Sequence, residues 1–178
     1  MPTHLGFLRA VNVGKRQYRT ADLRAALEGA GYADVETYIQ TGNIRISSPL
    51  RSREKVEAEL EAVFLADRGF EVPTIVFSSG ELRTVAEDAS EIGFVRPKGE
   101  GGHYVNLMKA PIPDADLEEL RGLTQDGVTL IARGRALHLL YEFSIGQAAK
   151  PSARAERLLG LATNRSAKVI GEIVEKWC

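Results

Sequence analysis

Several features that would point directly to a function are missing from this sequence. Its single cysteine is the last residue, Cys178, so the chain can form neither an internal disulfide nor a paired-cysteine metal site. No apolar run approaches the about 18–20 residues of a membrane-spanning helix, and the start has no apolar signal core. Apolar residues make up 44% and charged residues 26% of the chain, as is ordinary for a globular protein. We therefore expect a cytoplasmic protein with no membrane partner.

An excess of positive charge is also absent. Lys and Arg together number 23 against 24 for Asp and Glu, which gives a net charge of −1. Proteins that bind duplex nucleic acid usually carry a basic excess, so this balance argues against that class. The balanced net charge does not exclude a local basic patch.

Histidines are few and scattered. His4, His103 and His138 lie far apart and show no ligand spacing, and nothing places one beside a candidate nucleophile. We expect His138 to be a half-exposed strand residue. We also expect a solvated helix face formed by Glu54, Glu57, Glu59 and Glu61. The sequence therefore predicts no metal site and no other cofactor.

The first half of the chain predicts the order strand, helix, strand, strand, helix, strand. The predicted strands cover residues 5–12, 35–39, 44–47 and 72–77, the last at a sheet edge because Pro73 cannot donate to a ladder. The first helix should have Thr20 as its N-cap and stop before Gly31. The second should be capped by Ser52 and end at Gly69.

This order defines a ferredoxin-like plait, with an antiparallel sheet in strand order 4-1-3-2 and both helices on one face. In that topology the loop after the first strand and the tip of the hairpin between the second and third strands share one edge. Residues 12–16 and 40–43 should therefore face each other.

A weaker copy of the pattern follows. A helix beginning at Ser79 and a glycine-rich connector lead to predicted strands over residues 104–108, 128–132 and 136–141, with a helix opening at Asp114. We expect the closing strand to be missing and helices over residues 152–161 and 166–177 to follow the last hairpin. The predicted fold class is α+β, with two tandem ferredoxin-like (alpha-beta plait) units, the second incomplete and closed by C-terminal helices. The predicted domains are 1–78, a connecting helix and linker over 79–102, and 103–178.

Polar and basic side chains gather at the shared edge of the first plait. The candidate ligand-binding residues are Arg9, Asn12, Lys15, Arg16, Gln40, Thr41 and Asn43. A buried arginine needs a carboxylate, carbonyl groups or a bound anion, so Arg9 is either an anion anchor or half of a structural salt bridge. Lys15 and Arg16 form either a phosphate cradle or a solvated basic loop. Gly42 and Asn43 suit a ligand site or simply a tight turn.

At these residues the chain resembles the bacterial family called domain of unknown function 1697. Members have a strand ending Leu-Arg-Gly/Ala-Ile/Val-Asn-Val-Gly-Gly, a helix near Leu-Arg-x-x-Leu and then Tyr-Ile-Gln-Ser-Gly-Asn. Residues 8–14, 22–27 and 38–43 match these motifs, with Lys15 in place of the second glycine and Thr41 in place of the serine. The resemblance implies two alpha-beta plaits and a bacterial cytoplasmic protein, and it implies no established activity.

The second half departs from the family's pattern. Residues 144–150 replace the family's Gly-Ile-Gly-Arg-Ser-Lys, and residues 162–168 replace its Ala-Thr-x-Arg-Asn-Trp-Asn. The Ser-Lys and Asn-Trp-Asn groups are thus absent. If those groups carry the family's activity, we expect this chain to have lost or altered that activity.

Two functions remain open from the sequence. The first is a domain that binds an anionic small molecule or a short nucleic acid at the edge of the first plait. The alternative is an enzyme acting on a phosphate or acyl-phosphate compound by electrostatic preorganisation. RNA recognition on the sheet face is weaker, because the third predicted strand offers no aromatic residue on which a base could stack.

Overall fold

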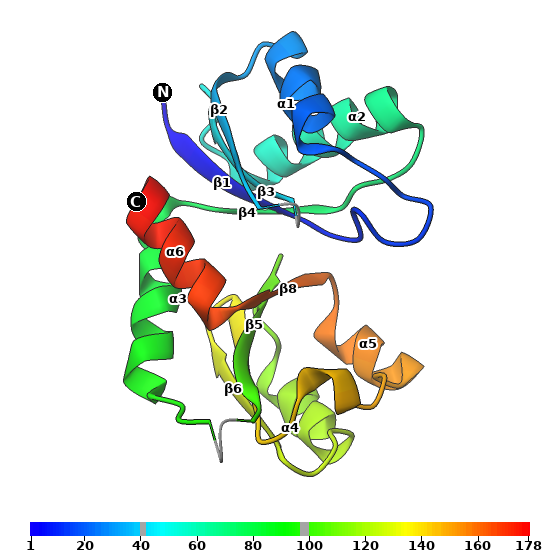
Figure 1. The fold of residues 1–178 in the computed structure, drawn as a ribbon, viewed down its shortest axis with the longest axis vertical. Helices are drawn as coiled ribbons and strands as arrows, with labels where there is room; N and C mark the ends of the chain where they lie inside the picture. Colours follow the sequence, from blue (N-terminus) through cyan, green and yellow to red (C-terminus); the bar gives the residue numbers. More distant parts are fainter. Residues whose placement is uncertain (40–41, 97–99) are drawn as a thin grey trace. The chain divides into compact units, whose positions relative to one another are not determined.

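The structure is a computed structural model that describes residues 1–39, 42–96 and 100–178. The chain divides into two compact units (Figure 1). Unit 1 comprises Met1–Leu82 with Trp177–Cys178, and unit 2 comprises Arg83–Lys176. Both are mixed α+β, and each contains a four-stranded antiparallel sheet.

Unit 1 follows the predicted order of elements. These are β1 (Thr3–Leu8), α1 (Thr20–Gly29), β2 (Ala33–Tyr38), β3 (Asn43–Ser47), α2 (Arg53–Arg68) and β4 (Thr74–Phe77), after which α3 (Ser79–Ile92) begins. The sheet has the order β2-β3-β1-β4, which confirms the predicted strand order. β4 therefore lies at an edge of the sheet, as Pro73 in the predicted strand indicated.

Both helices of unit 1 pack on one face of the sheet. Leu27 of α1 and Leu60 and Phe64 of α2 are fully buried in one cluster with Ile44 and Ile46 of β3. Apolar residues at helical spacing on one side and at every second strand position on the other meet in this cluster. The core thus forms between the helices and one sheet face.

The ends of α2 are those that the sequence predicted. The Ser52 side chain accepts a hydrogen bond from the backbone N–H of Lys55, and Gly69 ends the helix with a left-handed φ of 72°. The first helix differs slightly, because Arg19 rather than Thr20 is its N-cap residue and no side chain caps it.

The prediction of a fully solvated glutamate face on α2 is wrong. Glu57 is buried, and its Oε1 accepts a 2.9 Å hydrogen bond from the N–H of Val76. Glu61 Oε1 accepts an equivalent 2.9 Å bond from the N–H of Thr74. These two N–H groups belong to the edge strand β4 and need acceptors from outside the sheet. Carboxylates one helical turn apart match N–H groups two strand residues apart.

Unit 2 repeats the topology of unit 1. Its elements are the rest of α3, then β5 (Gly102–Met108), α4 (Asp114–Gly122), β6 (Val128–Arg133), β7 (Ala136–Tyr141), the 3₁₀ helix η2 (Ile145–Gln147), α5 (Ala153–Leu159), β8 (Ala162–Ser166) and α6 (Ala167–Trp177) up to Lys176. The sheet order is β6-β7-β5-β8.

The prediction that the second unit lacks its closing strand is therefore wrong. β8 pairs antiparallel with β5, from Tyr104 opposite Ser166 to Met108 opposite Ala162. The segment Ala-Thr-Asn-Arg-Ser has only one apolar residue, so it carries no strand-like hydrophobic pattern. Its position at the edge of the sheet, with a partner on one side only, allows so polar a strand.

The prediction that His138 is half-exposed is also wrong, because this residue is fully buried. It lies in β7 opposite Val105, between a strand partner on each side. In the described part of the chain, no helix is both long and apolar enough to cross a membrane.

Candidate functional site

In unit 1 the end of β1 and the hairpin between β2 and β3 adjoin through Leu8 and Gly42, while residues 40 and 41 of the predicted edge lie outside the described residues. The backbone N–H of Leu8 donates a 2.8 Å hydrogen bond to the carbonyl of Gly42. Gly42 has a φ of +78°, and a Cβ there would lie 2.8 Å from both Leu8 Cβ and Val11 Cγ2. Glycine is thus required both by the backbone conformation and by the close approach. We call residues 9–16 together with Gly42 and Asn43 the loop edge.

The loop after β1 is folded on itself. The N–H of Asn12 donates to the Arg16 carbonyl at 2.7 Å, and the N–H of Arg16 donates to the Val13 carbonyl at 3.1 Å. Asn12 Oδ1 accepts a 2.9 Å bond from the N–H of Tyr18. Tyr18 is buried, in edge-to-face contact with the Phe64 ring at 5.7 Å. The loop is therefore held in one conformation with Lys15 at its tip.

Left-handed backbone is concentrated at the loop edge and beside it. Among the described non-glycine residues, φ is positive at Ala10 (57°), Asn12 (57°), Asp34 (52°) and Ile39 (49°). Three of these four belong to the loop after β1 or to the end of β2. The conformation is costly for alanine and more so for a β-branched isoleucine, and it persists where the surroundings enforce it.

The strand that carries Arg9 is shorter than predicted, because β1 ends at Leu8 and the chain bends at Arg9. The Arg9 N–H donates to the carbonyl of Pro73, and its half-buried side chain meets no partner among the described residues. The structural salt bridge considered for Arg9 is thus not formed there.

The other predicted residues have different roles. Lys15 and Arg16 are exposed, and the Arg16 guanidinium carbon lies 5.6 Å from the centre of the Phe70 ring. Asn43 is fully buried, and its Nδ2 donates a 2.9 Å bond to the Tyr38 carbonyl, which holds the hairpin. Gln40 and Thr41 lie outside the described residues.

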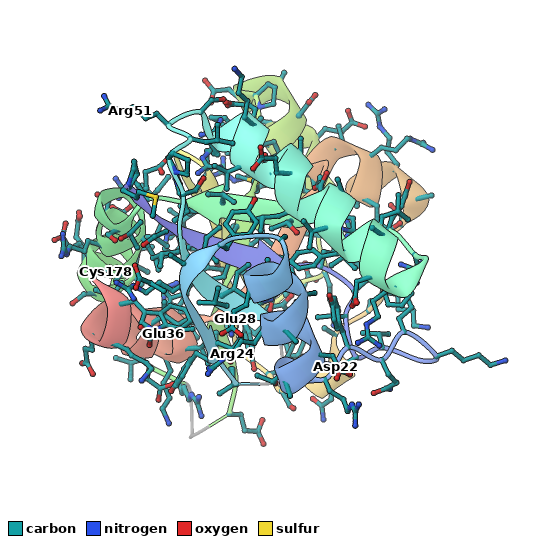
Figure 2. The ribbon with its side chains drawn as sticks, turned by 90° about the horizontal axis from the view of Figure 1, so that it is seen from above. Asp22, Arg24, Glu28, Glu36, Arg51 and Cys178 are labelled. Carbon is teal, nitrogen blue, oxygen red and sulfur yellow. The ribbon has the colours of Figure 1, made fainter. Side chains whose placement is uncertain are left out.

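The carboxylate at the start of α1 is already paired with two arginines. Asp22 (Figure 2) pairs with Arg19 at 2.9 Å and with Arg68 at 3.0 Å. The hydrogen bond from Arg19 lowers the pKa of Asp22, and Arg68 acts in the same direction. Arg68 also lies 4.5 Å from the centre of the Tyr18 ring, so it helps to fix the loop.

A cavity in unit 2 was not predicted from the sequence. It has a volume of about 300 Å³ and lies between β5–β7 of the sheet, α4, α5 and residues 148–151. Its lining is mostly apolar, with Leu130, Leu137 and Leu139 from the sheet. The one signal in the sequence is Asn106, a polar residue between apolar Val105 and Leu107 in the middle of β5.

Unit 2 also contains a pair of histidines, on β5 and β7. A 2.9 Å hydrogen bond joins His103 Nε2 and His138 Nδ1. Burial lowers the pKa of His138 to about 4, with His103 and Arg133 acting in the same direction, and burial also lowers the pKa of His103. Two histidines alone do not make a metal site, and across residues 1–39, 42–96 and 100–178 no three His, Cys, Asp or Glu residues are grouped to hold an ion.

Comparison with known proteins places this fold without assigning an activity. A family model described as "Protein of unknown function (DUF1697)" matches residues 1–138. No curated protein matches the chain. Among solved structures, the conserved bacterial protein SP0830 from Streptococcus pneumoniae is similar, with a TM-score of 0.69 and 22% sequence identity over 99% of this chain and 98% of that one. At this identity the likeness shows the fold alone.

Proposed function

The chain belongs to the DUF1697 family, whose function is unknown, and from the chain's own residues we propose that unit 1 binds an anionic small molecule at the loop edge. We also propose that both units are ferredoxin-like plaits. Each has the order βαββαβ with its first strand between its third and fourth, and each is followed by one more helix.

The observation that carries the binding proposal is the left-handed backbone at Ala10, Asn12 and Ile39. Residues in such conformations tend to gather where a protein holds a ligand, because a fixed loop loses little entropy on binding. The hydrogen bonds of Asn12 and the burial of Tyr18 supply the rigidity that this mode of binding needs.

Charge favours an anion. Arg9 and Lys15 are cationic and meet no partner among the described side chains, while Asp22 nearby is already paired with two arginines. Arg16 adds a third positive charge on the same loop. The guanidinium of Arg9 can make a bidentate contact with a phosphate or carboxylate, and Lys15 can add a point charge.

The structural roles of Asn12 and Asn43 narrow the contacts that we propose. Both side chains stabilise the loop edge itself, so the ligand would meet Arg9, Lys15 and exposed backbone groups. A short single-stranded nucleic acid offers the same phosphate chemistry. Its binding would be indifferent to sequence and would fall steeply with salt.

An enzyme acting on a phosphate or acyl phosphate is the alternative for the same residues. A fixed arginine can stabilise developing charge without a general base. Turnover of a generic acyl phosphate or phosphomonoester, lost in Arg9→Ala with the fold intact, would establish this alternative. Absence of turnover across a broad panel would reject it.

The binding proposal is tested by thermal-shift titration of the full chain with inorganic phosphate, nucleotides, phosphosugars and short oligonucleotides. We expect at least one anion to raise the melting temperature of the wild type, and this rise to be lost in Arg9→Ala and Lys15→Ala. Arg51→Ala is the matched control, because exposed Arg51 follows β3 at the other end of that strand and lies far from Asp22 in Figure 2. Equal stabilisation of all four proteins, or of none, would overturn the proposal.

A further inference from the structure

The cavity of unit 2 is closed on several sides by elements of one core. α4 and α5 cover the same face of the second sheet (Figure 1), and Leu120 and Leu158 pack with Leu130 and Leu137 there. Residues 148–151 form a further wall, and they lie beyond the residues that the family model matches. At roughly 30 Å³ per water molecule, the about 300 Å³ of space could hold about ten waters.

Asn106 is the buried polar group of this cavity. Its side chain lies in the middle of β5 and is only 9% exposed. Asn106 Oδ1 accepts a 2.9 Å hydrogen bond from Nδ2 of Asn164, the residue opposite it on β8. That bond fixes the orientation of the amide and turns its Nδ2 away from Asn164. No acceptor among the described residues pairs with this Nδ2.

Asn106 Nδ2 does not belong to the fully buried side-chain atoms that lack a partner, so this donor is open to the adjoining space and can donate to an acceptor that enters it. Asn106 lines the cavity, so an acceptor can reach it from there. The rest of the lining supplies apolar surface, chiefly leucines of the sheet and the two helices. A ligand that satisfies both needs has an apolar body and one hydrogen-bond acceptor.

The charges of the lining point to an uncharged ligand. Lys150 and Glu156 both contribute to the lining, both are exposed and their charges are opposite. A single neutral amide cannot compensate the desolvation of a carboxylate, whereas it suffices for a carbonyl oxygen.

We propose that this cavity is a second ligand site, which binds a small uncharged, mainly apolar molecule whose carbonyl or similar oxygen accepts a hydrogen bond from Asn106 Nδ2. The site is independent of the loop edge, because all of its lining residues belong to unit 2. A molecule of about ten non-hydrogen atoms fits the available volume, at the same roughly 30 Å³ each.

Three probes of one skeleton test the proposal on the full chain. Acetophenone carries the acceptor, ethylbenzene lacks it, and benzoate replaces the neutral group by a charged one. Binding is followed by titration of the ¹⁵N-labelled protein, with the amide resonances of the lining residues as readout. We expect acetophenone to bind about tenfold more tightly than ethylbenzene, as one hydrogen bond allows. Benzoate should bind more weakly than acetophenone.

Two variants distinguish the contribution of the Asn106 hydrogen bond to probe affinity from the contribution of the cavity space. Asn106→Leu should weaken acetophenone about tenfold and leave ethylbenzene unchanged or tighter. Ala148→Trp, at a half-buried position on the outer wall, should block all three probes by filling space. Melting curves establish that each variant is folded, and Thr129→Ala, exposed on β6 outside the lining, is the control that should bind as the wild type does.

Each contrary result is decisive. Equal binding of acetophenone and ethylbenzene, or no effect of Asn106→Leu on a folded protein, would overturn the role of Asn106. Preferential binding of benzoate would overturn the uncharged ligand. Shifts confined to residues outside the lining, or no shifts with any probe, would show that only water occupies this space.

Discussion

Leu8 and Gly42 are joined by a 2.8 Å hydrogen bond from the N–H of Leu8 to the carbonyl of Gly42. This bond places the end of β1 against the hairpin between β2 and β3, although 33 residues separate the two in sequence. Through this contact the loop after β1 and the hairpin lie side by side at one edge of the sheet. The close approach of the two segments leaves no room for a side chain at position 42.

Replacing Gly42 by alanine should destabilise the protein by about 2–4 kcal/mol. The new Cβ would meet Leu8 and Val11 at 2.8 Å, and the φ of +78° is itself unfavourable for alanine. Gly14→Ala is a matched control, because Gly14 has a φ of +59° but open space around it. That variant should lose only about 1 kcal/mol in chemical denaturation. Equal losses in the two variants would show that the close approach at Gly42 does not matter.

Glu57→Leu should lower the free energy of unfolding by about 1–3 kcal/mol, because the N–H of Val76 loses its acceptor in a buried position. Glu57→Gln keeps an acceptor oxygen and the shape of the side chain, so its loss should be clearly smaller. Urea denaturation measures both. A leucine variant as stable as the wild type would show that the edge of β4 is satisfied in another way.

Stability should fall between pH 6.5 and pH 4 through the buried His138. The pKa of His138 is lowered to about 4 in the folded protein, against 6.5 when unfolded, so the unfolded chain binds the proton more readily. The contribution of His138 is therefore fully present above pH 6.5 and is lost as the pH falls towards 4. At about 1.36 kcal/mol per pKa unit it reaches about 3 kcal/mol.

Denaturation of the wild type and of His138→Leu at several pH values measures this term. The variant should show a weaker dependence on pH in that window. Parallel curves for the two proteins would mean that His138 is as easily protonated in the fold as in the unfolded chain.

Ending the chain at Ala167 should destabilise it by several kcal/mol, at about 1.5–3 kcal/mol for each large buried side chain removed. The truncation removes Ile170 and Ile173, which are fully buried, and Trp177, which is 7% exposed. Within unit 1, Trp177 Nε1 donates a 3.0 Å bond to Glu36 Oε2, and its ring meets Tyr38 edge to face at 6.2 Å. Native fluorescence of the single tryptophan should accordingly be blue-shifted. A truncated chain that melts at the wild-type temperature would contradict this.

Elements of the fold were predictable where local chemistry and burial agree. α2 has Ser52 before it, Gly69 after it and apolar residues at helical spacing, so both of its ends follow from the sequence. β8 was missed because it is a polar edge strand, stabilised by its ladder with β5 rather than by its own apolar residues. The hydrophobic periodicity of a sequence does not reveal strand pairing of this kind.

Individual polar residues were harder to place than elements. Glu57 was expected in solvent, because nothing in the sequence shows that α2 lies beside the free N–H groups of β4. The loop edge was predictable as a neighbourhood because topology determines it, and the bond between Leu8 and Gly42 joins the end of β1 to the hairpin there. The structural role of Asn43 and the cavity at Asn106 depend on tertiary packing, which the sequence does not display.

Mapping of amide resonances shows residue by residue whether an anion binds at the loop edge. The ¹⁵N-labelled chain is titrated with the anion that raises its melting temperature most, or with inorganic phosphate if none does. We predict saturable shifts of the amide resonances of Arg9, Lys15 and Gly42. The amide resonances of Arg51 and of the cavity residue Asn106 should not shift. The absence of saturable shifts at the loop edge, or shifts of the same size at Arg51, would show that the loop edge is not an anion site.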